Sequence, residues 1–132
     1  MGARRKAREL ALQMLFENDV AGTLADEMFR RSADLQKAPA ALRDFTERLV
    51  SGTLEHRDDL DAIISKQADH WRLSRMPIVD RNILRLAIYE MSRQETPPAV
   101  VIDEALELAR QFSGERSVSF INGVLDAVHK EN

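Results

Sequence analysis

The segment from Ile78 to Arg93 places the strongest constraint on the fold of this chain. When it is drawn as a helix, apolar side chains occupy most of its circumference. A helix that is apolar nearly all round is buried, so other helices have to cover it on several sides. Pro77 precedes the segment, and proline is favoured in the first turn of a helix. The sequence therefore predicts an all-α protein built around this central helix. Its apolar residues are Val79, Ile83, Leu84, Leu86, Ala87, Ile88 and Met91.

The remainder of the chain repeats the helical period and shows no strand-like alternation of useful length. Gly22 is expected to end the first helix, and Thr23 is a candidate N-cap for the second. Asp58, Asp59 and Asp61 suit the positive end of a helix dipole and mark the start of the fourth. About seven helices result, in a bundle of two parts within a single domain. The residues expected to face inward in this fourth helix are Leu60, Ile63, Ile64 and Ala68. The last helix is expected to be capped by Ser117 and to end near Lys130. The other expected helices span roughly Arg4 to Val20, Leu24 to Leu35, Ala40 to Glu55 and Ala99 to Phe112.

Composition excludes several classes of function. The chain has 132 residues and no cysteine, which excludes disulfides, thiolate zinc sites and cysteine nucleophiles. Its three histidines are far apart, and no glycine-rich phosphate loop or nucleophile elbow is present. We therefore expect no enzyme, no metal site and no cofactor. No stretch approaches the roughly 20 apolar residues that cross a bilayer, and we expect a cytoplasmic protein.

Positive charge is concentrated at the start of the chain. Four basic residues, the segment Arg4 to Lys6 and Arg8, precede the first acidic residue, Glu9. From Glu9 onward, fifteen basic and twenty-two acidic residues give a balance of −7, within a net charge of −3 for the whole chain. A short basic arm on an acidic body is typical of a protein that binds a polyanion at one local site.

The first helix also brings an aromatic side chain near this arm. At about 100° per residue, Leu12 and Phe16 fall on the side of Arg5 and Arg8 and away from the helix's main apolar stripe. Guanidinium groups neutralise phosphates and an aromatic ring can stack on an unpaired base, so this combination suits single-stranded RNA better than duplex. In the alternative interpretation, Leu12 and Phe16 pack on a neighbouring helix and the arginines are simply solvated. The spacing alone leaves both interpretations open.

Four charged residues interrupt the apolar central helix. Asp80, Arg81, Arg85 and Glu90 can pair internally, since buried charges must be paired. Alternatively, Asp80 and Arg81, which lie near the start of the helix, face a partner protein. Position in the sequence does not decide between these alternatives.

Four further residues are expected to have structural roles. His70 and Trp71 are expected to plug the bundle, since tryptophan is mostly buried. Gly123 is expected to let another helix approach closely, because a glycine inside a helix usually has a packing reason. Asn122 beside it would then need hydrogen-bond partners in the interior.

Five segments together resemble the NusB family of bacterial transcription antitermination factors. The basic arm resembles the family's arginine-rich start, two central segments match its middle, and two later segments match its last two helices. In this order and at this spacing, in a chain of this length, the combination is specific. The segments are Arg4 to Gln13, Trp71 to Met76, Val79 to Glu90, Asp103 to Ala109 and Phe120 to Asp126.

The resemblance implies an all-helical fold of two small bundles packed together, which we place at about residues 1–72 and 73–132. It also implies binding to the single-stranded boxA RNA of ribosomal RNA leaders. NusE, which is also a small-subunit ribosomal protein, would bind this RNA jointly, in a complex with RNA polymerase and other Nus factors. No catalysis is implied. The sequence leaves open whether the free protein is a monomer or a homodimer.

Residue by residue, the resemblance assigns the basic arm, Phe16 and the start of the last helix to RNA. Phe16 stands where tyrosine is common in the family, which keeps the ring but not the hydroxyl. Arg116 replaces the family's usual aspartate, and Ser119 replaces its lysine. Asp80 is the expected contact for a basic residue of NusE, with Arg81 beside it, and Asp80→Lys is expected to weaken that contact without unfolding the protein. The expected RNA-binding residues are Arg4, Arg5, Lys6, Arg8, Phe16, Arg116 and Ser119.

A protein-interaction module of the same fold, without RNA binding of its own, is the alternative function. NusB-like domains also occur fused to ribosomal RNA methyltransferases, where such a role is conceivable. The intact basic arm favours the RNA-binding function.

Overall fold

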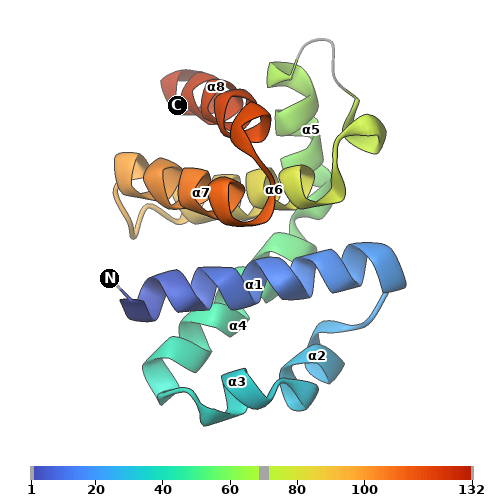
Figure 1. Cartoon of the computed structure of the whole chain (residues 1–132), viewed down its shortest axis with the longest axis vertical. Helices are drawn as coiled ribbons and strands as arrows, with labels where there is room; N and C mark the ends of the chain where they lie inside the picture. The colour runs from blue at the N-terminus through green and yellow to red at the C-terminus, as the bar shows by residue number, and fades with distance from the viewer. Residues whose placement is uncertain (1, 69–71, 132) are drawn as a thin grey trace.

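The computed structural model of the chain describes residues 2–68 and 72–131 (Figure 1). These residues form eight α-helices and one short 3-10 helix, η1, with no strand among them, which confirms the predicted all-α class. His70 and Trp71, predicted to plug the bundle, lie outside the described residues. In chain order the elements are α1 (Gly2–Ala21), α2 (Ala25–Arg31), α3 (Ala33–Lys37), α4 (Ala40–Glu55), α5 (Arg57–Gln67), η1 (Leu73–Arg75), α6 (Ile78–Arg93), α7 (Pro98–Phe112) and α8 (Glu115–Glu131).

Proline and glycine set several helix ends where the sequence predicted them. α4 and α6 begin directly after Pro39 and Pro77 and span the predicted residues. Gly22 follows α1 with a φ of 74°, a left-handed conformation that glycine adopts without strain. Its N–H donates to the Asn18 carbonyl at 2.8 Å and closes the last turn of the helix.

The predicted helix over Leu24 to Leu35 is two helices, which is why the described residues hold eight rather than seven. Ser32 has an extended backbone between α2 and α3, and its Oγ accepts a hydrogen bond from the Leu35 N–H at 3.1 Å. This serine therefore caps a new helix instead of continuing the old one. Thr23 is not the N-cap of α2, because Leu24 occupies that position without a side-chain hydrogen bond.

α6 lies at the centre of the molecule, as its apolar circumference predicted. It packs against α1, α4, α5, α7 and α8 (Figure 1). Ile83 and Leu84 in its middle are fully buried. In α5, the predicted inward positions are correct for Leu60 and Ile64, whereas Ile63 is 39% exposed and faces solvent.

The helices fall into a lower and an upper group in Figure 1. α1 to α4 lie in the lower group, and α5 to α8 lie in the upper group. α1 and α4 both pack on α6 and join the two groups. α5 packs on α6 and α8 and so lies with the upper group, while a division into two bundles at about residue 72 stays a prediction.

The close approach between helices occurs at a different glycine from the one predicted. A Cβ added to Gly123 would meet nothing within 4 Å, and both Asn122 and Gly123 are exposed on α8. A Cβ added to Gly52, in contrast, would overlap the ring of Tyr89. Gly52 therefore lets α4 and α6 pack closely, and the prediction of an interhelical contact at Gly123 is wrong.

Candidate nucleic-acid and partner interface

The basic arm is helical from its first described residue. α1 begins at Gly2, so the four basic residues lie within its first two turns. Successive side chains leave a helix about 100° apart, so these four cannot all face the same way. Arg4 and Lys6 are exposed, Arg5 is half-buried, and Arg8 is buried. Only part of the predicted cluster therefore faces solvent.

Carboxylates of α6 and α7 bind Arg5 and Arg8, the two inner arginines of the arm. Arg5 donates from Nε and Nη2 to Glu104 of α7 at 3.2 and 2.9 Å. Arg8 donates from the same two atoms to Glu90 of α6 at 2.8 and 2.6 Å. The hydrogen bonds from Arg5 lower the pKa of Glu104, so this carboxylate is ionised at neutral pH. Each arginine thus forms a forked, charge-assisted pair inside the protein.

Arg8 lies in the interior, which differs from the predicted position on the surface. Its side chain is 6% exposed, and that of Glu90 is 5% exposed. Its Nη1 also lies 3.8 Å from Glu104. The internal-pairing interpretation is thus correct for Glu90, and the guanidinium of Arg8 is turned away from solvent.

Arg4 and Lys6 supply the accessible charge of the arm. The Arg4 guanidinium lies 4.3 Å from the centroid of the Phe45 ring, a cation–π contact that fixes its direction without cancelling its charge. The Lys6 ammonium is 4.0 Å from Asp34, and both side chains are more than half exposed. Such an exposed pair is weak, so the lysine remains available to a phosphate.

Phe16 is an exposed aromatic side chain on the same face of α1 as Arg5. It is 39% exposed, and eleven residues, or about three turns, separate it from Arg5. The two side chains are therefore about 16 Å apart along the helix axis. Leu12 between them is 3% exposed. The packing interpretation is correct for Leu12, while the ring of Phe16 remains accessible.

A second group of predicted residues surrounds a pocket at the start of α8. Arg116 and Ser119 are both exposed there. Arg116 and Phe120 line a pocket of about 290 Å³ together with Met76 and Pro77, which precede α6. The pocket combines an apolar wall with one cationic side chain at its edge.

Asp80 contributes the carboxylate at the base of this pocket and is not on the surface. It is 3% exposed. Its two oxygens accept hydrogen bonds from the hydroxyls of Ser113 and Ser117, each at 2.7 Å. Ser117 was predicted to cap the last helix, but α8 begins two residues earlier and the hydroxyl binds Asp80 instead. Asp80 therefore joins the start of α6 to the turn between α7 and α8, and Asp80→Lys would place an ammonium in a buried position.

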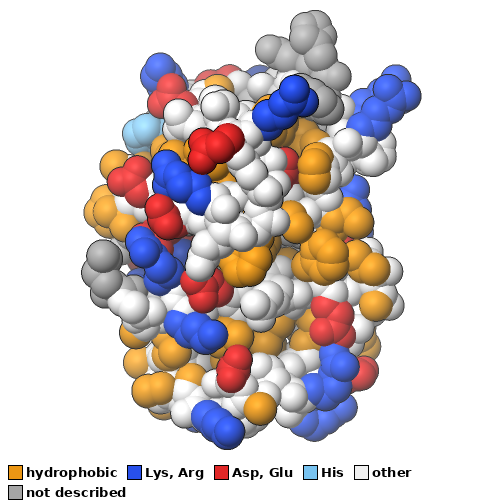
Figure 2. Space-filling view, viewed as in Figure 1, with side chains coloured by type: hydrophobic (Ala, Val, Ile, Leu, Met, Phe, Trp, Pro, Cys, Tyr) orange, Lys and Arg blue, Asp and Glu red, His pale blue; other side chains and the backbone are white. Residues whose placement is uncertain are grey.

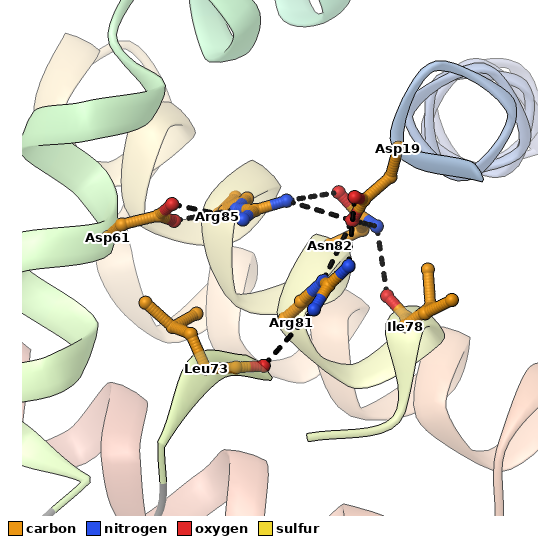
Figure 3. A network of polar contacts seen from close by, with 7 residues as sticks. All are labelled: Asp19, Asp61, Leu73, Ile78, Arg81, Asn82 and Arg85. Carbon is orange, nitrogen blue, oxygen red and sulfur yellow. Dashed lines mark hydrogen bonds and ion pairs between the residues drawn. The ribbon is translucent and has the colours of Figure 1, made fainter. Parts of the chain in front are cut away.

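Arg81 belongs to a network of charges that links α1, α5 and α6 (Figure 3). It donates to both oxygens of Asp19 at 2.8 and 2.9 Å, and to the Leu73 carbonyl at 3.2 Å. Arg85 donates to Asp61 at 2.6 and 3.0 Å and also reaches Asp19 at 3.0 Å. Burial opposes ionisation of Asp19, but the hydrogen bonds from Arg81 and from Asn82 outweigh it and lower its pKa to about 2.

The sequence did not reveal which residues pair with the charged side chains inside the protein. Glu104 was noted only within a family segment, Asp61 only as a helix start, and Asp19 not at all. Arg81 and Asp19 are separated by 62 residues in the chain. The apolar pattern of α6 predicts that a charged residue on this helix needs a partner. The pattern does not identify a partner so far away in the sequence.

Figure 2 shows the face of the molecule on which α1, α7 and α8 lie. Acidic and basic side chains are interspersed over this face, and hydrophobic side chains gather between the second half of α1 and the start of α6. No extended basic field is visible on it. The charge on this face is therefore mixed rather than uniformly basic.

The described part of the chain has neither a metal-binding cluster nor a membrane-spanning helix. Within residues 2–68 and 72–131, no three His, Asp or Glu side chains are grouped so that they could hold a metal ion. No helix in those ranges is both long enough and apolar enough to cross a membrane.

Known proteins resemble this chain over nearly its whole length, in sequence and in fold. The model of the NusB family matches residues 5–130. The transcription antitermination protein NusB of Solibacter usitatus is 53% identical over 133 residues, covering 99% of this chain and 91% of the relative. The protein of the same name from Elusimicrobium minutum is 48% identical over 134 residues, covering 99% of this chain and 96% of the relative.

Solved structures agree with the sequence relatives. NusB of T. maritima superposes with a TM-score of 0.90 at 32% identity, covering 98% of this chain and 92% of that one. A NusB chain solved with NusE and double-stranded RNA gives a TM-score of 0.89 at 28% identity, covering 100% of this chain and 99% of that one. With a family match over nearly its full length and relatives of about half-identical sequence, the chain belongs to the NusB family.

Proposed function

We propose that this chain is a transcription antitermination factor that binds the single-stranded boxA RNA of ribosomal RNA leaders together with NusE. The complex then joins RNA polymerase and the other Nus factors. The observation that carries the proposal is that α1 presents exposed basic side chains in its first two turns and the exposed ring of Phe16 about three turns after Arg5. Two relatives that bear the antitermination name support the role in transcription, and a related chain solved with NusE and double-stranded RNA supports binding to NusE and to RNA.

The RNA backbone would meet the arm, and an unpaired base would meet the aromatic ring. Arg4 and Lys6 are exposed and can each neutralise a phosphate. Arg5 uses only Nε and Nη2 in its pair with Glu104, so its Nη1 donors remain for a phosphate oxygen. Arg8 would act from the interior, by holding α1 against α6. Phe16 would stack on a base, which favours a single strand over a duplex.

The exposed start of α8 would extend this surface. Arg116 offers a further positive group and Ser119 a hydroxyl, both on the outer side of the helix. A hydroxyl can bind a phosphate or a base edge but contributes no charge. We therefore expect Arg116 to affect the salt dependence of RNA binding and Ser119 to affect affinity alone.

NusE would dock on the pocket between the start of α6 and the start of α8. The apolar wall formed by Met76, Pro77 and Phe120 suits an apolar side chain of the partner. Asp80 would supply its charge from the base of the pocket, and Arg81 would keep the start of α6 in place through Asp19. Asp80→Asn is the suitable variant, because it removes the charge from a buried position without adding bulk.

A binding experiment with three RNAs tests the proposal. BoxA RNA, a scrambled single strand and a boxA duplex are titrated with the protein, with and without NusE, at 50 and 200 mM salt. We expect the tightest binding for single-stranded boxA with NusE present, and weak, salt-sensitive binding by the protein alone. Equal binding to boxA and scrambled RNA would reduce the site to a general polyanion arm, and tighter binding to the duplex would overturn the stacking role of Phe16.

The alternative function is a protein-interaction module that does not bind RNA itself. The pairing of Arg5 and Arg8 with carboxylates favours this alternative, because two of the four basic residues are already neutralised. Retained NusE association with no RNA binding under any of the conditions would establish it. Sedimentation of the free protein in the same buffers distinguishes a monomer from a homodimer.

A further inference from the structure

A carboxylate occupies the edge of Arg5 that would be best suited to an RNA phosphate. Glu104 receives two parallel hydrogen bonds from Nε and Nη2, at 3.2 and 2.9 Å. Arginine binds carboxylates and phosphates through this same forked geometry. An incoming phosphate can therefore take this edge only by displacing Glu104, or it can bind the remaining Nη1 donors and leave the pair intact.

The position of Glu104 suits control of charge better than support of the fold. The side chain of Arg5 is 37% exposed, and exposed ion pairs contribute little to stability. Arg8, which is buried, already has Glu90 as its own partner. The carboxylate of Glu104 nevertheless lies 3.8 Å from Arg8 as well, so a single negative charge on α7 faces both inner arginines of the arm.

We propose that Glu104 is a specificity-determining residue of the RNA surface, an inference that rests on the proposed function. It reduces the attraction of the arm for any polyanion, because its negative charge offsets the positive charge of Arg5 and its carboxylate occupies the Nε–Nη2 edge of the guanidinium. It also fixes the guanidinium, so that Nη1 is presented in one direction. Some RNAs can place a phosphate at Nη1 of Arg5 while their bases contact the rest of the surface. Such an RNA leaves the pair between Arg5 and Glu104 intact and is favoured over other RNAs.

Glu104→Gln is the test, because glutamine keeps the size of the side chain and removes its charge. Arg5 is then free to neutralise one more phosphate, so the slope of log K against log salt becomes steeper by about 0.7 for a single strand. Lowering the salt from 200 to 50 mM should thus raise the affinity for scrambled RNA about threefold more than in the wild type. The affinity for boxA with NusE should rise by less, so the ratio of boxA to scrambled affinity should fall.

Glu107→Gln is the matched control. Glu107 lies three residues later in α7 and its charge also acts on Arg5, but its carboxylate accepts a hydrogen bond from Arg110 at 2.8 Å. Its removal changes the net charge of the protein by the same amount. We expect this variant to shift both affinities alike and to leave their ratio unchanged.

The outcomes separate the inference from the proposed function. If the wild type discriminates boxA from scrambled RNA and Glu104→Gln leaves the ratio unchanged, or lowers it no more than Glu107→Gln does, the role assigned to Glu104 is wrong. If the wild type does not discriminate, the proposed function fails and the inference fails with it. Thermal unfolding of both variants tests whether the fold is retained, which we expect because glutamine keeps the size of the 13%-exposed Glu104 side chain and the Glu107 side chain is 41% exposed.

Discussion

Replacing Arg8 by alanine is expected to destabilise the folded protein as its main effect. The substitution leaves Glu90, which is 4% exposed, as a buried carboxylate without its forked partner. Breaking a buried pair by removing one member costs about 3–5 kcal/mol. Urea unfolding, followed by circular dichroism, measures the loss directly.

Lys6→Ala is the control for this prediction, since it removes a basic residue from the same arm. Its ammonium is exposed and only 4.0 Å from an equally exposed Asp34. The free energy of unfolding should change by less than about 0.5 kcal/mol. A similar small change for Arg8→Ala would show that Glu90 finds another partner or water, and that the internal pair contributes little.

The ionised state of Asp19 should make the stability depend on pH in the acid range. Its pKa is lowered from 3.8 to about 2 in the folded protein. Because the folded-state pKa is the lower one, the stabilisation is complete above about pH 5 and is lost as the pH falls towards 2. After allowance for solvent screening, the contribution is about 1–2 kcal/mol, of which roughly half should disappear between pH 6 and pH 3.

Asp19→Asn tests this dependence when it is compared with Asp26→Asn, an exposed carboxylate of α2. The free energy of unfolding of each protein is measured in urea at pH 6 and pH 3. The difference between the wild type and Asp19→Asn should narrow at pH 3, while the Asp26 variant should follow the wild type. If the difference in the free energy of unfolding is the same at both pH values, Asp19→Asn acts through lost packing or hydrogen bonds rather than through lost charge.

The charged residues of α6 show what the sequence can predict about single residues. A charge on an apolar helix predicts an internal pair, and this is correct for Arg81, Arg85 and Glu90. The identity of the partner was not predictable, since Asp19 and Asp61 come from helices that only the tertiary fold brings to α6. For the same reason the sequence could not show that Arg8 turns inward while Arg4 remains exposed.

At the scale of helices, two glycines with similar sequence contexts should respond to alanine in opposite ways. Gly123 lies on the exposed side of α8 with nothing within 4 Å of a Cβ, so alanine should stabilise the helix by about 0.5–1 kcal/mol. Gly52 lies where α4 meets α6, and a Cβ there would overlap Tyr89. Alanine at Gly52 should cost about 1–3 kcal/mol or more, as overpacking does.

Thermal unfolding of Gly123→Ala and Gly52→Ala gives the sign of each change. Binding adds a second readout for Gly123→Ala, because the methyl group projects from α8 between Ser119 and Asp126, on its exposed side. A more stable protein with unchanged binding to boxA and NusE would show that α8 is not approached closely at this point. A less stable Gly123→Ala protein would contradict the exposed position of this glycine.

Helix ends were predictable where proline or glycine sets them, and not where a side-chain hydrogen bond does. Pro39, Pro77 and Gly22 set the starts of α4 and α6 and the end of α1, because their backbone preferences act locally. The break at Ser32 depends on one hydrogen bond to Leu35, which the period of apolar residues does not reveal. Ser117 has the residue type of an N-cap, but its hydroxyl binds Asp80, 37 residues away.

At the scale of the whole molecule, the distribution of charge decides how the protein can approach RNA. The net charge is −3, so long-range attraction to a polyanion has to come from local basic groups, which are the arm and Arg116. Within the arm, Glu90 and Glu104 neutralise the two inner arginines. The arm then has about two accessible charges, which should contribute only about −1.4 to the slope of log K against log salt when the protein alone binds RNA.

The combined variant Arg4→Ala, Lys6→Ala should abolish most of this salt dependence. Removing two phosphate contacts should flatten the slope by about 1.4 and weaken boxA binding at 50 mM salt far more than at 200 mM. The control is Arg57→Ala, Lys66→Ala, which removes the same charge from α5, in the other group of helices. Isothermal titration at four salt concentrations gives both slopes. If the two variants flatten the slope equally, net charge rather than the arm governs binding, and the assignment of the RNA surface to the start of α1 is wrong.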